Sequence, residues 1–243
     1  MHISISVRAM SKTAIISGAS SGIGAATAQK FIQLGYTVVN IARRKSPVDN
    51  VINVSADLST DEGAKHAAAQ AAEAITAGGV VALVHNASLM LKDTVHDCSS
   101  DELMRVLAVN VGAVNTLNRE LLPRMSAGSS VIYVGSTLSE KAVAGAHSYV
   151  ISKHAQLGQM RATCQDLMGS QIHTAMICPG FTDTEMLKQH LGGDTELMHE
   201  IGSQNGFGRL VTPEEIAGAI SWAHQSPVIN GSVIHANLGQ IER

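Results

Sequence analysis

Charged side chains are scarce in this sequence: Asp, Glu, Lys and Arg make up 15 % of the 243 residues, against about 25 % in an average soluble domain. So few charges exclude a disordered chain and a coiled coil. The formal net charge is -3, and the basic residues form no long run. The electrostatic pattern that binds a nucleic-acid backbone is therefore missing, and we expect no nucleic-acid partner.

Cysteine is also rare. Cys98, Cys164 and Cys178 form no CxxC pair, and an odd number of scattered cysteines argues against a disulfide framework and a structural zinc site. The histidines are scattered too, and His199-Glu200 is not followed by a second histidine in the HExxH register. No metal site is expected.

Long apolar runs are absent. No run reaches the roughly 18 residues of a membrane span, and residues 1–10 lack the charged and apolar regions of a signal peptide. We therefore expect an unexported protein without a membrane partner, and the unpaired cysteines favour the reducing cytoplasm. The organised pattern begins only after Met10, a candidate alternative start. Residues 1–10 are thus expected to be an N-terminal extension.

What the sequence does contain is a regular alternation of short apolar runs with longer amphipathic stretches. This order predicts βαβ units around a parallel sheet, that is, one doubly wound α/β domain. Strands are predicted at residues 13–17, 37–41, 51–54, 80–84, 131–134, 172–177 and 232–236. Helices are predicted at residues 23–34, 60–77, 100–125, 148–168 and 213–224.

Three predicted helices begin with a capping pair, a hydroxyl three positions before a carboxylate. These pairs are Ser59 with Glu62, Ser99 with Glu102 and Thr212 with Glu215. The stretch 179–210 differs from the rest, because glycines are scattered there among polar residues. Such a segment is typical of a mobile lid. No linker or repeat divides the chain, so a single domain over residues 1–243 is expected.

The first predicted strand runs into Ser17-Gly18-Ala19-Ser20-Ser21-Gly22-Ile23-Gly24, which opens a helix. Glycines allow a tight turn and close backbone approach, so that a pyrophosphate can bind at the helix N-terminus. The segment therefore predicts a dinucleotide-binding turn. A tight turn that serves only packing is the alternative.

Tyr149 and Lys153 lie four positions apart in a predicted helix and therefore share one face. A cation near a phenol lowers the pKa of the phenol from its usual value of about 10. The pair thus predicts a general acid or base at Tyr149. A packed tyrosine beside a solvated lysine is the alternative.

Together with Ser136 in Val-Gly-Ser-Thr and Asn110 in Val-Asn-Val, the GxxxGxG turn and the YxxxK pair resemble the short-chain dehydrogenase/reductase family. The resemblance spans nearly the whole chain, with Ser17 in place of the usual threonine. It implies a single-domain, three-layer Rossmann-type fold with a parallel sheet of about seven strands. It also implies an oxidoreductase that transfers hydride between a nicotinamide cofactor and a small carbonyl or alcohol substrate, working as a homodimer or homotetramer.

The resemblance implies a role for each catalytic residue. Tyr149 would protonate the carbonyl oxygen or deprotonate the alcohol, and Ser136 would hydrogen-bond the same oxygen. Lys153 would contact the nicotinamide ribose and tune the phenol. Asn110 would hold a water that continues the proton relay from Lys153. An asparagine that only bonds to the backbone is the alternative.

Cofactor-binding residues follow from the same resemblance. They are Gly18, Ser20, Ser21, Gly22, Ile23, Gly24, Asp57, Leu58, Asn86, Ala87, Tyr149, Lys153, Pro179, Gly180, Thr182 and Thr184. Asp57 would bond the adenine amino group or cap the next helix, and Thr184 would bond the carboxamide. No acid stands near Ala42, where a protein that binds NAD would place one; Arg43 and Arg44 follow instead. Guanidinium groups suit a 2′-phosphate, so NADP(H) is the expected cofactor.

Two departures from the family pattern matter. His85-Asn86-Ala87-Ser88 stands where most members of the family have Asn-Asn-Ala-Gly. This motif is similar to that of some pteridine-reducing members. A pteridine-type reductase is therefore one alternative function, and a non-catalytic NADP(H)-sensing protein is another. We expect His85 to be hydrogen-bonded at the sheet end and not catalytic. The connection over residues 42–50 is too short for a helix, which predicts a mostly non-helical crossing.

Overall fold

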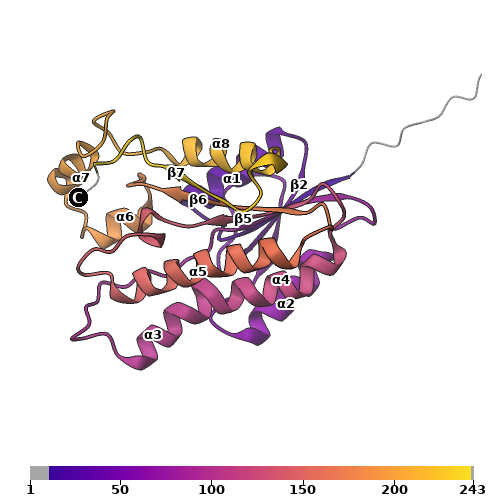
Figure 1. The fold of residues 1–243 in the computed structure, drawn as a ribbon, viewed down its shortest axis with the longest axis horizontal. Coiled ribbons are helices and arrows are strands. Elements are labelled where there is room, and N and C mark those ends of the chain that lie inside the picture. The colour runs from indigo at the N-terminus through magenta and orange to yellow at the C-terminus, as the bar shows by residue number, and fades with distance from the viewer. Residues whose placement is uncertain (1–10, 242–243) are drawn as a thin grey trace, which may run out of the picture.

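The computed structural model describes residues 11–241 (Figure 1). One sheet contains seven parallel strands in the order β3-β2-β1-β4-β5-β6-β7. The strands are β1 (Lys12–Ser17), β2 (Thr37–Ala42), β3 (Val51–Ser55), β4 (Val80–His85), β5 (Ser130–Val134), β6 (His173–Pro179) and β7 (Ser232–Ala236). The predicted doubly wound α/β fold is confirmed. The extension expected over residues 1–10 lies outside the described residues.

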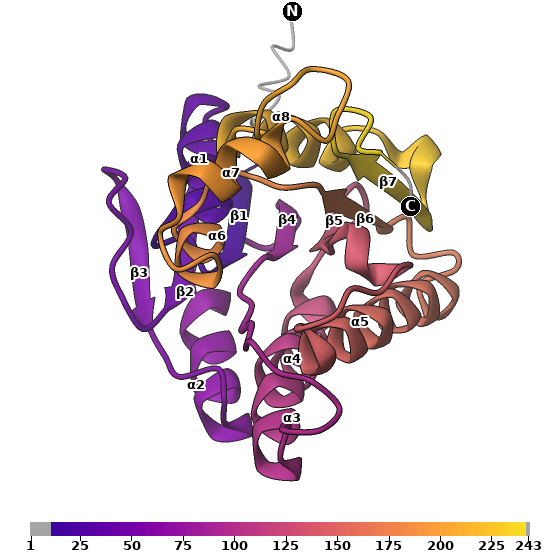
Figure 2. The ribbon, with the colours of Figure 1, turned by 90° about the vertical axis from the view of Figure 1, so that its left-hand side faces the viewer.

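Helices cover both faces of the sheet, which gives three layers (Figures 1 and 2). On one face, α1 (Gly22–Gln33) packs beside α8 (Pro213–His224). The other face is covered by α2 (Asp61–Ala72), α4 (Ala113–Leu121) and α5 (His147–Asp166). No helix among residues 11–241 is long and apolar enough to cross a membrane.

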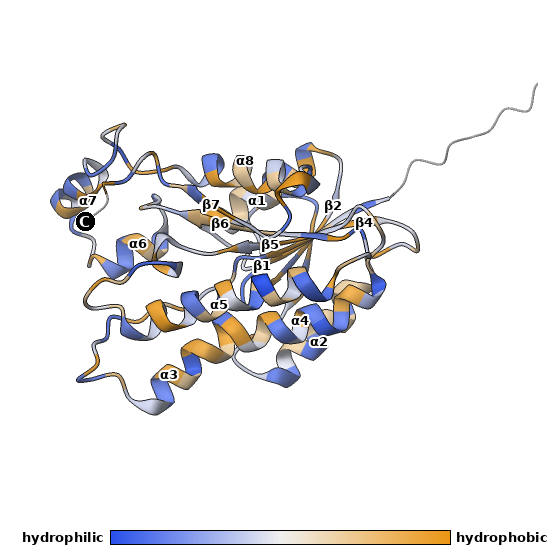
Figure 3. Ribbon diagram, viewed as in Figure 1, coloured by the Kyte–Doolittle hydropathy of each residue, from blue (hydrophilic) through white to orange (hydrophobic). Residues whose placement is uncertain are grey.

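The central strands are apolar at successive positions because both faces of a parallel sheet are covered. In β1, Ile15 points into the core beneath α2 and α4, whereas Ala14 and Ile16 point toward α1 and α8. Figure 3 shows the strands as apolar and the outer faces of the helices as mixed with hydrophilic residues. The two apolar layers hold the sheet rigid, so the strand ends are fixed in position.

The connection between β2 and β3, residues 43–50, contains no helix, as its length predicted. Side chains close it instead: Asn40 Nδ2 donates to the carbonyl of Arg44 at 3.1 Å and to Asn53 Oδ1 at 3.0 Å. Asn50 adopts a left-handed backbone with φ of 63°. This short crossing holds Arg43 and Arg44 close to the end of β2.

The helix predicted over residues 100–125 is divided. It consists of α3 (Ser100–Leu107), a π-helical turn η1 (Ala108–Gly112), α4 and the short 3-10 turn η2 (Leu122–Arg124). Inserted π turns occur often at functional sites, and this one contains Asn110. The capping boxes at Ser99 and Thr212 are confirmed, whereas Thr60 and not Ser59 caps α2.

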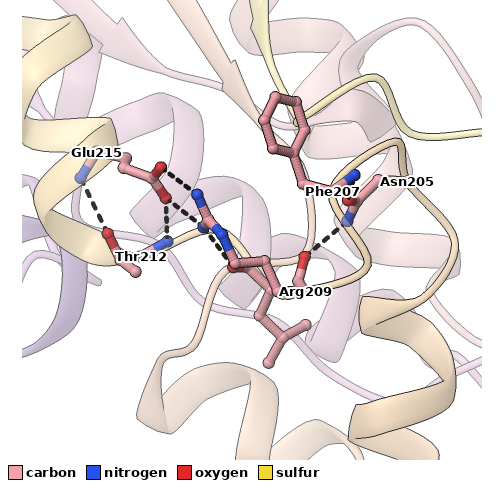
Figure 4. Close-up of polar contacts among 6 residues, drawn as sticks. Asn205, Phe207, Arg209, Thr212 and Glu215 are labelled. Carbon is pink, nitrogen blue, oxygen red and sulfur yellow. Dashed lines mark hydrogen bonds and ion pairs between the residues drawn. The ribbon is translucent and has the colours of Figure 1, made fainter.

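The segment 179–210 contains two short helices, α6 (Glu185–His190) and α7 (Thr195–Gly202). Figure 2 shows both helices in front of the sheet edge. At the end of this segment, the Arg209 guanidinium donates two hydrogen bonds to the Glu215 carboxylate, at 2.8 and 2.7 Å (Figure 4). The glycine-rich stretch is therefore anchored at the start of α8.

Two buried histidines connect the sheet to its helices. His224 on α8 bonds the Tyr36 hydroxyl at 2.9 Å and Ser130 Oγ at 2.7 Å. His85 at the end of β4 bonds Asn118 Oδ1 on α4 at 2.7 Å, which agrees with the structural role expected for it. Burial is the main cause that lowers the pKa of each ring to about 4. Both histidines are therefore neutral at pH 7.

We expect the stability of the protein to fall in mild acid because of these two rings. Between pH 6.5 and 4 these two histidines bind protons in the unfolded chain but stay neutral in the folded state. As the pH is lowered through this range, the free energy of unfolding therefore decreases by about 1.4 kcal/mol per pH unit for each histidine. Urea unfolding from pH 7.5 to 4.5 measures this slope. His224→Gln should remove the contribution of one histidine to this slope, whereas the exposed control His96→Gln should leave the slope unchanged. An unchanged slope in His224→Gln would contradict the assignment.

Candidate active site

The residues expected to be functional gather where the strands end. Ser17, His85, Val134 and Pro179 end β1, β4, β5 and β6, and the carboxyl ends of parallel strands meet at one edge. Ligands of open α/β sheets bind at this edge. Figure 2 looks onto it, with α6 and α7 in front.

The turn between β1 and α1 requires glycine at two positions. Gly18 has φ of 76°, and a Cβ there would lie 2.9 Å from the Cα of Ala87. A Cβ on Gly24 would overlap the carbonyl oxygen of Gly18. These two glycines let the turn pack closely against the end of β4. The helix α1 begins at Gly22 without a side-chain cap, and an uncapped helix N-terminus suits an anion.

Ser17 and Asn86 lock the ends of β1 and β4 together. The Ser17 hydroxyl accepts hydrogen bonds from the backbone N–H groups of Asn86 and Ala87, each at 3.0 Å. In return, Asn86 Nδ2 donates to the carbonyls of Ser17 at 3.1 Å and Gly18 at 3.0 Å. Serine thus supplies the hydroxyl that a threonine would supply at this position. The geometry of the turn depends on this pair.

The second strand brings basic residues to the same turn. Arg44 Nη2 lies 3.5 Å from Ser21 Oγ, and Arg43 faces the Asp57 carboxylate, whose pKa is lowered first by hydrogen bonds from Ser59 and also by the charge of Arg43. Asp57 Oδ1 accepts from the Ser59 N–H at 2.9 Å, and Leu58 is buried. Asp57 therefore closes a turn just before α2, while Thr60 caps the helix itself.

The segment after β6 lies next to the turn between β1 and α1. The Gly180 N–H donates to the Ala236 carbonyl at 3.1 Å, and Thr182 Oγ1 donates to the Gly180 carbonyl at 3.0 Å. Thr184 caps α6, and its Cγ2 would lie 3.1 Å from a Cβ on Gly22. The turn and the start of the lid segment are therefore neighbours.

Tyr149 and Lys153 share one face of α5, and both are buried, with 8 % and 1 % exposure. Lys153 Nζ lies 5.5 Å from the centre of the Tyr149 ring. The ammonium donates to the Val134 carbonyl at 2.8 Å and to Gln156 Oε1 at 3.2 Å. Burial lowers the pKa of Lys153 to about 8.

Burial has the opposite effect on the phenol. It raises the pKa of Tyr149 to about 12, while the hydroxyls of Ser136 and Ser88 lower it. The expectation of a lowered Tyr149 pKa is therefore wrong in this structure, because loss of solvent outweighs every favourable neighbour. At neutral pH the group is a phenol, which is the form that donates a proton.

Ser136 and Asn110 come from elements outside α5. Ser136 follows β5, and its Oγ accepts from the Leu138 N–H at 3.1 Å. Asn110 Oδ1 accepts from the Leu89 N–H at 2.7 Å, and its Nδ2 donates to the Leu89 carbonyl at 2.9 Å and to Ser152 Oγ at 2.8 Å. The Asn110 side chain therefore holds the loop after β4 and does not contact Lys153.

Four residues at this edge were not predicted as site residues. Ser88 lies beside the phenol, and Cys178 on β6 is a buried thiol whose pKa burial raises to about 11. Asn40 Oδ1 accepts from the Ala19 N–H in the turn at 2.9 Å. Gln156 bonds Lys153, and its spacing of three positions from Lys153 was a signal that it shares the same face. Among residues 11–241, no cluster of three His, Cys, Asp or Glu suits a metal ion.

Comparisons with known proteins bear on the family and the fold of this chain. A family model described as enoyl-(acyl carrier protein) reductase matches residues 18–240. The chain is 27 % identical to carbonyl reductase family member 4 of Danio rerio, over 95 % of this chain and 98 % of that protein. It is 28 % identical to NADPH-dependent aldehyde reductase 2 of Arabidopsis thaliana, over 94 % and 93 %. The solved structure of Thermoplasma acidophilum aldohexose dehydrogenase superposes with a TM-score of 0.86 at 23 % identity, over 95 % and 94 %.

We expect Ser17→Ala to destabilise the protein, because two backbone N–H groups at the end of β4 then lose their acceptor. The free energy of unfolding should fall by about 1 to 3 kcal/mol, measured by urea unfolding at pH 7. Ser17→Thr retains the hydroxyl and should unfold near the wild-type midpoint. Equal midpoints for the alanine and threonine variants would refute the role given to the hydroxyl.

Proposed function

Because this chain belongs to the short-chain dehydrogenase/reductase family, we propose that it is an NADP(H)-dependent oxidoreductase acting on a small carbonyl or alcohol substrate. One observation supports this most: a buried phenol and a buried ammonium lie side by side on α5, at the strand edge that also holds the glycine turn. A structural role alone does not explain a fully buried lysine whose hydrogen-bond acceptors among residues 11–241 are a carbonyl and a carboxamide instead of a carboxylate.

The residues of the turn fit a dinucleotide. The tight turn that Gly18 and Gly24 allow, and the N-terminus of α1 without a side-chain cap, suit a pyrophosphate. Thr184 is close enough to this turn to contact a molecule bound there. When bound, the nicotinamide supplies or accepts the hydride. The chain itself has to orient the substrate and move the proton.

Tyr149 is the proposed general acid in the reducing direction. Its pKa of about 12 keeps the proton on the phenol until a substrate oxygen becomes basic enough to take it. The Ser136 hydroxyl, next to the phenol, would hydrogen-bond the same oxygen. As the phenolate forms, the Lys153 ammonium stabilises it by charge. In the oxidising direction the same groups would accept the alcohol proton.

NADP(H) is proposed over NAD(H) because of charge. Residues 42–45 read Ala-Arg-Arg-Lys without an acid, and Arg44 lies against Ser21 at the turn. A 2′-phosphate there would meet the guanidinium groups of Arg43 and Arg44 and no acidic side chain from residues 42–45. The relative from Arabidopsis thaliana is named for NADPH, which agrees with this choice.

A pteridine-type reductase remains the alternative substrate class. His85, the residue that suggested it, packs in the core against Tyr133, with ring centres 5.1 Å apart, and offers no group to a substrate. A non-catalytic NADP(H) sensor is the other alternative. A homodimer or homotetramer in the cytoplasm stays a prediction from the family resemblance and the cysteine content.

We expect Tyr149→Phe to lower kcat for carbonyl reduction by about 100- to 10,000-fold, because the proton donor is lost. Loss of NADPH absorbance measures turnover over a panel of ketoacyl thioesters, quinones, sugars, diketones and dihydropterins. NADPH binding, followed by nucleotide fluorescence, should be retained. Full activity in the variant would refute the proton donor, and tight binding without turnover in the wild type would favour the sensor.

Arg44→Ala should discriminate between the two cofactors. Loss of a charge-assisted bond to the 2′-phosphate is expected to raise KM for NADPH about 10- to 100-fold and to leave KM for NADH within about twofold. Arg124→Ala, at the end of η2 before β5 begins, is the control. If both cofactors weaken equally, Arg44 does not read the phosphate.

A further inference from the structure

Gln156 extends the functional face of α5 by one turn. Tyr149, Lys153 and Gln156 are spaced by four and three positions, so their side chains lie along one side of the helix. Gln156 is fully buried, with an exposure of 0 %. A buried carboxamide is unfavourable unless its polar atoms are hydrogen-bonded, so its partners indicate what it does.

Both ends of this carboxamide are used. Gln156 Oε1 accepts from Lys153 Nζ at 3.2 Å, and Gln156 Nε2 donates to the Asn110 carbonyl at 3.3 Å. The π turn holds this carbonyl in place, since the Asn110 side chain is tied to Leu89 and Ser152. The proton relay expected from the sequence ran from Lys153 to Asn110, and here the two are joined by the Gln156 amide.

Gln156 has a particular effect on the charge of Lys153. The ammonium is buried, and its protein acceptors within residues 11–241 are the Val134 carbonyl from β5 and Gln156 Oε1. An acceptor that bonds the charged form favours that form. The titratable groups that face the ammonium are the Tyr149 phenol on its own helix and the Cys178 thiol on β6. Both are neutral at pH 7, because burial raises the pKa of each.

We propose that Gln156 is a positioning residue of this site: it fixes the Lys153 ammonium beside Tyr149 and keeps it protonated at the pH of catalysis. This inference rests on the proposed function. In that function, only a charged Lys153 stabilises the phenolate left when Tyr149 gives up its proton. Without Gln156, the lysine loses a charge-assisted hydrogen bond while it stays buried.

The test compares two substitutions of Gln156 with a matched control. Gln156→Met keeps the volume and removes both polar contacts, whereas Gln156→Glu keeps an acceptor for Lys153. Gln159→Met is the control, because Gln159 lies one turn further along α5 and also donates to a carbonyl, that of Val111 at 3.4 Å. This hydrogen bond of Gln159 does not involve Lys153.

The first readout needs no turnover. NMR of protein labelled with ¹³C-lysine follows the titration of Lys153, whose resonance is assigned by its loss in Lys153→Met. We expect Gln156→Met to lower the pKa of Lys153 by about one unit. Gln156→Glu should hold it at or above the wild-type value, and Gln159→Met should leave it unchanged. The same pKa in Gln156→Met and Gln159→Met would overturn the inference.

The second readout is the pH profile of kcat for carbonyl reduction. Above the pKa of Lys153 the lysine is neutral, so the alkaline decline of kcat should begin about one pH unit lower in Gln156→Met, with about a fivefold loss at pH 8 and little loss at pH 6. A loss that is equal at both pH values would indicate a packing defect and contradict the proposal. If Gln156→Met fails to fold, a fall in the Lys153 pKa of Gln156→Glu overturns it. Absence of turnover in the wild type refutes the proposed function, while the NMR titration still decides the role of Gln156.

Discussion

The burial of the Lys153 ammonium is the constraint around which this site is built. Taking a cation out of water is unfavourable unless fixed acceptors replace the solvent. Here the carbonyl of Val134 at the end of β5 and the Gln156 carboxamide on α5 replace the solvent. Both acceptors stay in place only while β5 and α5 keep their positions. The sheet, the π turn and α5 are therefore coupled through one charged group.

The cofactor side depends on a different kind of constraint, the close approach of backbone to backbone. Gly18 and Gly24 leave no room for a side chain, because Asn86 and Ala87 occupy the space beside them. The Ser17 hydroxyl accepts hydrogen bonds from the backbone N–H groups of Asn86 and Ala87 at this contact. Rigid placement of the turn follows from these bonds, and a preformed site loses less entropy when it binds a ligand.

The sequence was sufficient to predict the fold, and the structure brings most of the predicted site residues to one edge of the sheet. Apolar runs located every strand, and the capping pairs at Ser99 and Thr212 marked two helix starts correctly. Local signals failed where the answer depends on tertiary burial. The π turn at Asn110 is invisible in the hydrophobic pattern, and the raised pKa of Tyr149 results from desolvation that no spacing rule reports. Gln156 was overlooked because a glutamine in a helix is normally exposed.

The central claim is that hydride passes between NADPH and a substrate carbon held at this strand edge. Transfer of deuterium tests it most directly. The protein is mixed with a panel of carbonyl compounds and NADPH deuterated at the nicotinamide C4 position, and the masses of the products are measured by mass spectrometry. The account predicts an alcohol with one deuterium on the former carbonyl carbon, from one of the two C4 faces. Products without deuterium, when NADPH deuterated on either face is consumed, would contradict it.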